Sequence, residues 1–259
     1  MSVLTGKQII DMGLVKNYDK NAIQPASVDV RLSNQFIKYD EDCILNPEEK
    51  PVYKFFTAEK IMIIPRGFQL KHSKQYLRHK YQIDKFIHGG VLGSTIEYVK
   101  VPENYVAIYT GRSSLGRMFV QSHQTAGLCD SGWEGRLTLE ITAHDLPVIL
   151  KAGMRIGQIY FMKLDDIPHE IYNGKYQKQE TVIPTKIYKD FQRYNENEIL
   201  KAYLIEGKSL VEICKEYEIE MKDLLSIFVK RGVDINNVKR GSRLNRLLYD
   251  IKDIDDNIE

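Results

Sequence analysis

Glu140 is the residue whose type and position are best suited to proton transfer. It lies in residues 136–141, where period-two alternation indicates a strand. The alternation places Thr138 and Glu140 on one face and apolar side chains on the other. An acid at mid-strand is usually a solvent-facing residue. A carboxylate partly shielded from water, in contrast, has a raised pKa and can act as both base and acid, so the neighbouring motifs must decide between the two.

A glycine- and arginine-rich turn, GRSSLGR at residues 111–117, follows a predicted strand at 105–109. Its glycines permit close backbone approach, and its hydroxyl and backbone N–H groups can surround phosphate oxygens. Arg112 and Arg117 add charge-assisted, bidentate donors. The turn is therefore a candidate phosphate-binding loop, but such a turn taken alone is more often a simple solvated loop.

Two further turns belong to the same block of sequence. Residues 125–135 contain Asp130 in a turn, where an acid can simply bond its own backbone. Residues 153–158, GMRIGQ, form a tight turn that leads into another strand. Neither turn identifies a reaction by itself.

The histidines and cysteines do not fit a zinc deaminase. That class needs His-x-Glu and Pro-Cys-x-x-Cys motifs to bind zinc and activate water. None of the six histidines is followed two residues later by glutamate, and no two cysteines are near each other. His72, His79 and His88 share one segment, and we expect structural or surface roles for them.

The composition is that of an ordinary globular chain of 259 residues, enough for one sizeable domain and a small appendage. With 37 basic and 35 acidic residues, the chain as a whole gives no argument for a nucleic-acid or membrane partner. No segment approaches the ~18 consecutive apolar residues of a membrane helix, and no secretory signal is recognisable at the start. Three widely spaced cysteines predict no disulfide framework and fit a reducing cytoplasm. They are Cys43, Cys129 and Cys214.

Residues 1 to about 188 are predicted to be mainly β. Short alternating or apolar runs, such as 27–32 and 105–109, are separated by turn signals that contain proline and glycine. This pattern is typical of a sandwich or barrel. One helix is expected near the start, where Thr5 can cap residues 7–12.

The pattern changes near Asn195. Apolar residues then recur at three- and four-residue spacing, as expected for helices, and Ser209 is a good N-cap. We therefore predict a separate small helical module at 195–259. Its segment 207–232 resembles a helix-turn-helix of the resolvase type.

The charge of this module argues against DNA binding. Residues 195–259 hold 11 Lys and Arg against 14 Asp and Glu, and DNA affinity depends on neutralising phosphates. A packing or oligomerisation role is favoured, with nucleic-acid binding as the alternative. The only basic footprint is the cluster Lys239, Arg240, Arg243 and Arg246.

Several motifs of the chain resemble the deoxycytidine triphosphate (dCTP) deaminase branch of the dUTPase-like superfamily. They are the turn at 111–117, residues 125–141 and 153–158, and the further segments 24–32, 92–98 and 175–179. The resemblance implies a distorted β-barrel or jelly-roll subunit, a homotrimer with active sites between subunits, and Mg²⁺ bound with the nucleotide triphosphate. It divides the chain into a dUTPase-like dCTP deaminase domain at 1–190 and the helical module at 195–259.

The resemblance also assigns catalytic roles. Glu140 matches the family's catalytic glutamate, at a position where plain dUTP pyrophosphatases carry no acid. One carboxylate can take a proton from the water that attacks C4 and return protons to N3 and the leaving amine. Ser113 and Arg117 are expected to hold the water and the cytosine, and Asp130 the sugar 3′-hydroxyl.

The remaining assignments concern substrate binding. Residues 112–114 face the phosphates, and Gln158, Lys175 and Gln179 belong to a carboxy-terminal lid over the triphosphate. The family's tyrosine before this lysine falls on a proline in a gapless count, so Tyr172 is chosen on the assumption of a shortened loop. The complete substrate-binding set is Arg112, Ser113, Ser114, Leu115, Gly116, Arg117, Asp130, Thr138, Leu139, Glu140, Gln158, Tyr172, Lys175 and Gln179.

Some members of the family stop at dUTP, whereas others also release pyrophosphate and form dUMP. Residues 123–127, HQTAG, look more like the second group, because Gly127 leaves room for a second water near the α-phosphate, with Asp130 to orient it. We expect a zinc-independent deaminase that forms dUMP. The alternatives are a deaminase that stops at dUTP, a dUTP pyrophosphatase, and a non-catalytic nucleotide sensor or DNA-associated regulator. A base-modified dCTP also stays open as the substrate.

Residues 68–90 form an insertion relative to the family's usual short connection. Aromatic residues alternate there with basic ones, and Asp84 is the only acid. Such a mixture can bind nucleic acid or phosphate, but a solvated hairpin is the favoured interpretation. The basic residues are Lys71, Lys74, Arg78, Lys80 and Lys85, and the aromatic ones include Tyr76, Tyr81 and Phe86.

Overall fold

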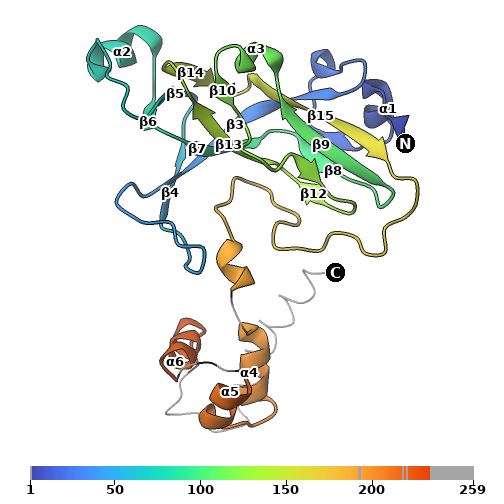
Figure 1. The fold of residues 1–259 in the computed structure, drawn as a ribbon, viewed down its shortest axis with the longest axis vertical. Coiled ribbons are helices and arrows are strands. Elements are labelled where there is room, and N and C mark those ends of the chain that lie inside the picture. The colour runs from blue at the N-terminus through green and yellow to red at the C-terminus, as the bar shows by residue number, and fades with distance from the viewer. Residues whose placement is uncertain (1, 192–193, 218, 220, 234–259) are drawn as a thin grey trace. The chain divides into compact units, whose positions relative to one another are not determined.

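The computed structural model describes residues 2–191, 194–217, 219 and 221–233. They belong to two compact units. The first consists of Met1–Leu45 and Pro51–Lys186, and the second of Asn46–Lys50 with the chain from Ile187 onward. The first unit is built mainly from strands and the second from helices (Figure 1). The predicted fold class, mainly β with a small carboxy-terminal helical part, is confirmed.

The elements follow one another with short connections. The strands are β1 Ser2–Val3, β2 Val15–Lys16, β3 Val28–Tyr39, β4 Tyr53–Thr57, β5 Lys60–Ile64, β6 Lys85–His88, β7 Val91–Thr95, β8 Tyr98–Lys100, β9 Tyr105–Gly111, β10 Val120–Gln121, β11 Leu128–Cys129, β12 Glu134–Gly135, β13 Thr138–Ala143, β14 Val148–Lys151 and β15 Arg155–Lys163. The helices are α1 Gly6–Asp11, η1 Lys20–Ala22, α2 Lys74–Tyr81, α3 Ser113–Gly116, η2 Ile187–Asp190, α4 Glu196–Leu204, α5 Leu210–Glu216 and α6 Met221–Lys230.

Three sheets make up the first unit. The largest has nine strands, seven of them in the order β10-β13-β7-β3-β15-β9-β11, with β1 beside β15 and β4 beside β3. Neighbouring strands of this sheet pair in the antiparallel direction. Two three-stranded sheets, β12-β8-β2 and β14-β5-β6, complete the unit. The large sheet curls into a distorted half-barrel around a shared apolar core (Figure 1).

Alternation along the central strands explains this core. β13 alternates between fully buried apolar residues, such as Leu139 and Ile141, and half-buried polar residues, such as Glu140. β9 and β15 alternate in the same way. Full burial of one Leu or Ile side chain contributes about 1.5–3 kcal/mol. The register is therefore strongly specified, because a slip by one residue would expose every apolar side chain of the strand.

The predicted helix starts are confirmed. The Thr5 hydroxyl accepts the N–H of Gln8, and the Gln8 side chain accepts the Thr5 N–H at 2.9 Å, which makes a capping box at the start of α1. Ser209 and Glu212 form the same arrangement at the start of α5. Both helices thus begin where the side-chain chemistry satisfies otherwise unpaired backbone N–H groups.

Residues 68–90 do not form the solvated hairpin that we expected. They contain α2, capped by Ser73, and β6, which pairs with β5 in parallel. Leu77 and Ile83 pack with Met62 and Ile64 in a small apolar cluster. The expectation was wrong because these apolar side chains need a surface to cover, which a solvated hairpin does not provide.

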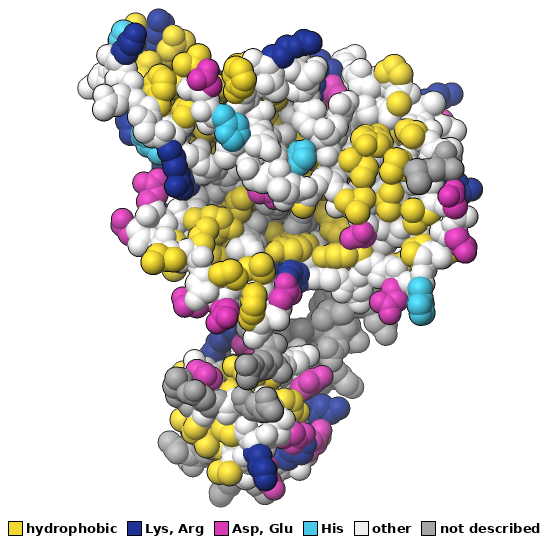
Figure 2. Space-filling model, viewed as in Figure 1, with side chains coloured by type: hydrophobic (Ala, Val, Ile, Leu, Met, Phe, Trp, Pro, Cys, Tyr) yellow, Lys and Arg dark blue, Asp and Glu magenta, His cyan; other side chains and the backbone are white. Residues whose placement is uncertain are grey.

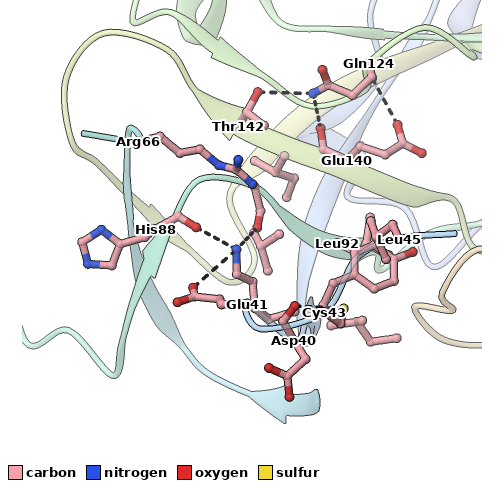
Figure 3. Close-up of a pocket in the computed structure, with 16 residues that line it drawn as sticks. Asp40, Glu41, Cys43, Leu45, Arg66, His88, Leu92, Gln124, Glu140 and Thr142 are labelled. Atoms are coloured by element: carbon pink, nitrogen blue, oxygen red, sulfur yellow. Dashed lines mark hydrogen bonds and ion pairs between the residues drawn. The ribbon is translucent and has the colours of Figure 1, made fainter. Parts of the chain in front are cut away.

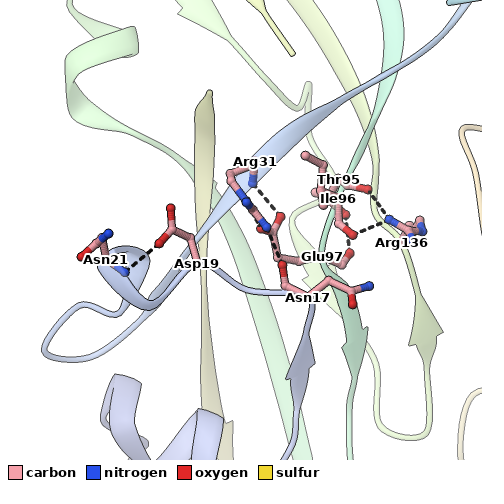
Figure 4. A network of polar contacts seen from close by, with 8 residues as sticks. All are labelled: Asn17, Asp19, Asn21, Arg31, Thr95, Ile96, Glu97 and Arg136. Carbon is pink, nitrogen blue, oxygen red and sulfur yellow. Dashed lines mark hydrogen bonds and ion pairs between the residues drawn. The ribbon is translucent and has the colours of Figure 1, made fainter. Parts of the chain in front are cut away.

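A fully buried carboxylate joins three parts of the first unit (Figure 4). Glu97 accepts the Arg31 Nε–H at 2.7 Å and the Arg31 backbone N–H at 2.6 Å. Arg31 also donates to the carbonyl oxygen of Asn17, and Arg136 donates to that of Ile96. Burial raises the pKa of Glu97 above its ordinary value. The network holds β3, the β7–β8 turn and the chain before β13 together.

Arg31→Met should destabilise the first unit more than Glu97→Gln. Loss of Arg31 leaves a buried carboxylate without its cation, which costs about 3 kcal/mol or more. Glutamine at 97 removes the buried charge and keeps an oxygen for the Arg31 N–H. Denaturant unfolding of both variants and the parent measures the free energies. An equal loss in both, or a larger loss in Glu97→Gln, would contradict this role.

The second unit has an apolar core of its own. Ile199 in α4 and Phe228 in α6 are fully buried within it. Glu196 also pairs with Arg231 at 3.1 Å, which joins the start of α4 to the end of α6. α5 and α6 occupy the segment that resembles a helix-turn-helix. The predicted basic cluster at 239–246 lies outside the described residues.

Further observations concern membrane helices, metal ligands, histidines and cysteines. Among the described residues, no helix is long and apolar enough to cross a membrane. Within the same part of the chain, no three His, Cys, Asp or Glu side chains gather as metal ligands. His72, His79 and His88 are exposed. The cysteines are unpaired thiols, Cys43, Cys129 and Cys214.

Candidate active site

The antiparallel pairing of β13 with β7 sets the position of Glu140. In this register Glu140 lies opposite Leu92, and Leu139 lies opposite Gly93. Side chains alternate across a strand, so Leu139 points into the core, where it is 1% exposed, and Glu140 points to the other face. There the half-buried carboxylate lies on the wall of two cavities.

One of these two cavities has a volume of about 490 Å³, and we call it the Glu140 cavity. Its wall is mostly apolar and aromatic, with a few polar groups, as is typical of small-molecule sites. Residues far apart in the sequence meet there. Five of the predicted site residues line it, namely Asp130, Thr138, Glu140, Tyr172 and Gln179.

Residues 171–185 contribute one wall of this cavity and are held by side-chain hydrogen bonds. The Gln177 amide nitrogen donates to the carbonyl oxygens of Gly132 and Tyr172, at 2.8 and 3.0 Å. Its oxygen accepts the N–H of Glu134 at 2.9 Å. The wall is therefore ordered before any substrate binds, and Tyr172 is fixed beside the cavity.

Gln179 leaves a polar atom unsatisfied in the same wall. The Gln179 side-chain nitrogen donates to the backbone carbonyl oxygen of Arg136, and the backbone carbonyl oxygen of Gln179 accepts the Arg136 N–H at 2.8 Å. Its Oε1 is buried and has no hydrogen-bond partner among the described residues. An unpaired buried acceptor is costly, so this oxygen is suited to a donor on a bound molecule.

Figure 3 shows the adjoining cavity, of about 560 Å³, which shares Tyr39, Leu92 and Glu140 with the Glu140 cavity. The backbone N–H of Gln124 donates to Glu140 Oε2 at 3.2 Å. The Gln124 side chain donates to the Glu140 carbonyl oxygen and to Thr142 Oγ1, also at 3.2 Å. Gln124 thus orients the carboxylate through neutral hydrogen bonds.

One cation near Glu140, Lys38, is engaged elsewhere. Lys38 Nζ donates to the carbonyl oxygens of His88 and Gly90, at 2.7 and 3.0 Å (Figure 3). Burial lowers the pKa of Lys38. Within the described part of the chain, Glu140 has no ion-pair partner. Its carboxylate is therefore not committed to a structural ion pair and is available for proton transfer.

The GRSSLGR turn lies at a separate hollow of about 390 Å³. Arg112, Ser113 and Gly116 line this hollow, together with His123 and His144. Neither cavity at Glu140 includes a residue of the turn. Within a single chain, Ser113 therefore lines neither of the two cavities at Glu140. The exposed residues of the turn also include Ser114 and Arg117.

Arg112 and Gln158 are placed differently from the prediction. Arg112 Nε lies 3.3 Å from the carboxylate of Asp29, which is buried and also lies 3.1 Å from Arg155. Gln158 lies within β15, opposite Asp29, and accepts the Ser27 hydroxyl at 3.1 Å. Its assignment to a carboxy-terminal lid is wrong, because strand pairing holds it in the sheet. Arg112 already has an acidic partner in the chain.

Three other predicted residues lie outside the lining of the Glu140 cavity. Leu115 and Leu139 are 7% and 1% exposed and belong to the core cluster, so their side chains do not face a cavity. Only their backbone groups are left for substrate contacts. Lys175 does not line the Glu140 cavity, and its Nζ lies 5.7 Å from the centre of the Tyr176 ring.

Burial decides which groups of the Glu140 cavity can ionise. It raises the pKa of Cys129 to about 12, so this thiol stays protonated at neutral pH and is a poor nucleophile. Burial also raises the pKa of Tyr39, whose hydroxyl accepts the N–H of Thr185 at 2.9 Å. The carboxylates of Glu140 and Asp130 are then the candidates for acid–base chemistry.

Gly127 has a packing role that the sequence did not reveal. Its carbonyl oxygen accepts the N–H of Tyr109 at 2.7 Å. A Cβ at position 127 would lie 2.5 Å from the Tyr109 carbonyl oxygen, which is too close for any side chain. Glycine is therefore required here by the approach of two backbones, whichever product the site forms.

Four residues near the site were not singled out from the sequence. Asp29 stands in a motif that resembles the family, and an acid between apolar strand residues was an available signal. Gln124 orients Glu140 partly through its backbone N–H, which no residue type reveals. Tyr39 and Gln177 act through contacts across long sequence separations.

Comparisons with known proteins identify the family of this chain. A family described as dCTP deaminase-like matches residues 3–164. A protein of Methanocaldococcus jannaschii named dCTP deaminase, dUMP-forming, is 40% identical over 198 residues, which cover 73% of this chain and 97% of that protein. Relatives of the same name from Methanococcus vannielii and Hydrogenobaculum sp. are 42% and 37% identical, covering 69% and 74% of this chain and 89% and 99% of their own. The chain therefore belongs to the dCTP deaminase-like family.

Proposed function

We propose that this protein removes the amino group of dCTP and then releases pyrophosphate, so that the product is dUMP. The observation that carries this proposal is the half-buried Glu140 carboxylate, oriented by the Gln124 N–H beside a cavity of suitable size. The substrate and product are supported by relatives that bear the name dCTP deaminase, dUMP-forming.

Glu140 acts first as a base and then as an acid. It takes a proton from water as the water oxygen attacks C4, and it delivers that proton to N3. The carboxylate then takes the proton of the new C4 hydroxyl and passes it to the amino group, the C4–N bond breaks as C4=O forms, and ammonia and dUTP are the products. Acid–base catalysis by a positioned group typically contributes about 10²–10⁴-fold.

A second water then cleaves dUTP between the α- and β-phosphates, giving dUMP and pyrophosphate. Asp130 is exposed at the mouth of the Glu140 cavity and is suited to orient this water or the sugar 3′-hydroxyl. Phosphoryl transfer depends mainly on positioning and on charge neutralisation. Lys175 supplies a cation next to the wall that contains Tyr172 and Gln179.

Mg²⁺ would be held mainly by the phosphates of the bound nucleotide. When bound, it would neutralise the phosphate oxygens and polarise the phosphoryl group. Asp130, an exposed carboxylate that lines the Glu140 cavity, is a hard oxygen donor of the kind that this ion prefers. Zinc has no part in the proposed deamination.

We further propose a homotrimer whose active sites lie between subunits. The support is the separation of Ser113 and Arg117 from Glu140 within one chain. A neighbouring copy would bring its α3 turn to Glu140, where Ser113 holds the water and Arg117 the cytosine. The site is then incomplete without the second chain.

Glu140→Gln should abolish ammonia release and retain triphosphate binding. The amide has nearly the same size but cannot take up and return a proton, so the rate should fall at least about 100-fold. A coupled ammonia assay with dCTP and Mg²⁺ measures the rate, and calorimetry measures binding. The matched control is Glu103→Gln, an exposed carboxylate outside both cavities. A Glu140→Gln rate within about tenfold of the parent would remove Glu140 from its role.

Ser113→Ala and Glu140→Gln should complement each other in mixed trimers. If each site is shared by two neighbouring subunits, about one third of the sites in trimers that contain both variants combine the two intact residues. The variants are coexpressed with different tags, and doubly tagged trimers are assayed for ammonia release. Each variant alone is the control. Mixed trimers with no activity above the single variants would contradict a shared site.

We also propose that residues 1–190 and 195–259 are separate domains, because each of these two stretches contains an apolar core of its own. Truncation after Tyr194 should leave deamination measurable while altering stability, assembly or partner binding. Turnover and light scattering of the truncated and full-length proteins test this. A well-folded truncated trimer that loses deamination entirely would place the helical unit in catalysis.

A further inference from the structure

Five exposed cations gather on and beside α2 and β6, in the part of the surface at the upper left of Figure 2. None of them has a carboxylate partner within the described part of the chain. The nearby acid, Asp84, instead accepts the backbone N–H groups of Glu59 and Lys60, both at 2.8 Å. We call the five residues the α2–β6 basic surface; they are Lys71, Lys74, Arg78, Lys80 and Lys85.

The fold does not depend on these charges. α2 is held by apolar contacts of Leu77 and Ile83, which are 7% and 1% exposed. Lys74 and Arg78 lie one turn apart on the same helix, with their charged groups 5.8 and 5.6 Å from the centre of the Phe86 ring. Like charges at this spacing weaken a helix. α2 contains no acidic residue that would offset this repulsion. A bound anion would relieve it.

Aromatic side chains lie exposed between the cations. Tyr76 is 47% exposed and Tyr81 is 39% exposed. Lys80 Nζ lies 5.7 and 5.1 Å from the centres of these two rings, and the His72 ring packs at 5.0 Å against Tyr76. Aromatic rings beside unpaired cations are the combination that binds unpaired bases by stacking and phosphates by charge.

We propose that the α2–β6 basic surface binds single-stranded nucleic acid. The cations contact the phosphates, and Tyr76 and Tyr81 stack on bases, which requires bases that are not paired in a duplex. A membrane surface fits less well, because the apolar residue of α2, Leu77, is buried in the fold instead of facing outward between the cations.

This surface is separate from the proposed catalytic site. None of the five cations lines the Glu140 cavity or the adjoining cavity. The residues to which we assign catalysis are therefore not part of the α2–β6 basic surface. Deamination can be measured in a variant that has lost nucleic-acid binding, and nucleic-acid binding can be measured in a variant that has lost deamination. Failure of one proposal can therefore be told apart from failure of the other.

Fluorescence anisotropy with a labelled oligothymidylate and the full-length protein tests the proposal. If all five cations contact phosphates, the logarithm of the binding constant should fall against the logarithm of salt concentration with a slope of about −3.5. Lys74→Gln/Arg78→Gln should make that slope shallower by about 1.4. Tyr76→Ala/Tyr81→Ala should weaken binding at least about tenfold with little change in slope.

The change in the slope of the salt dependence is the decisive result. Binding alone is not, because the basic cluster at 239–246 in the carboxy-terminal part could also bind the oligonucleotide. Lys7→Gln/Lys163→Gln, which changes two exposed lysines elsewhere on the first unit, should bind like the parent. Ammonia release and thermal unfolding should be unchanged in the surface variants. No binding at low salt, an unchanged slope in Lys74→Gln/Arg78→Gln, or tighter binding to duplex DNA or phosphatidylserine vesicles would overturn the proposal.

Discussion

The pairing of β13 with β7 is the constraint on which the candidate site depends. It directs Leu139 and Ile141 into the core and Glu140 to the opposite face, so burial of the apolar side chains also sets the position of the acid. The Arg31–Glu97 contact and the bond from Arg136 hold the chain just before this strand. The packing that stabilises the sheet therefore also fixes the position of the carboxylate that we assign to catalysis.

The polar groups around the cavity are ordered but not fully satisfied. Gln177 holds the wall that carries Tyr172, whereas Gln179 presents a buried oxygen without a donor among the described residues. Glu140 is bonded by the Gln124 N–H and not neutralised by a cation. Arg112 and Ser113 of the α3 turn line another hollow of the same chain. In the proposed trimer, assembly joins the acid to the groups that hold its substrate, so folding alone would not produce activity.

The sequence predicted those features that depend on local pattern. Alternation identified the open face of β13 and with it Glu140, and a hydroxyl at position 5 identified the start of α1. Features that depend on tertiary contacts were missed or wrong. Gln158 was assigned to a lid although strand pairing holds it in β15. The insertion was expected to be a hairpin because the packing of Leu77 under α2 is not visible in a list of charges.

Hydrolysis of dCTP in ¹⁸O-enriched water tests the central claim most directly, because each bond cleavage leaves one oxygen atom from water in a product. We expect mass spectrometry to detect dUMP with one ¹⁸O in its uracil base, and a second ¹⁸O in either the dUMP phosphate or the pyrophosphate. Glu140→Gln should form no labelled uracil. A nucleotide product whose base is still cytosine, or labelled uracil formed at the parent rate by Glu140→Gln, would contradict deamination by this carboxylate.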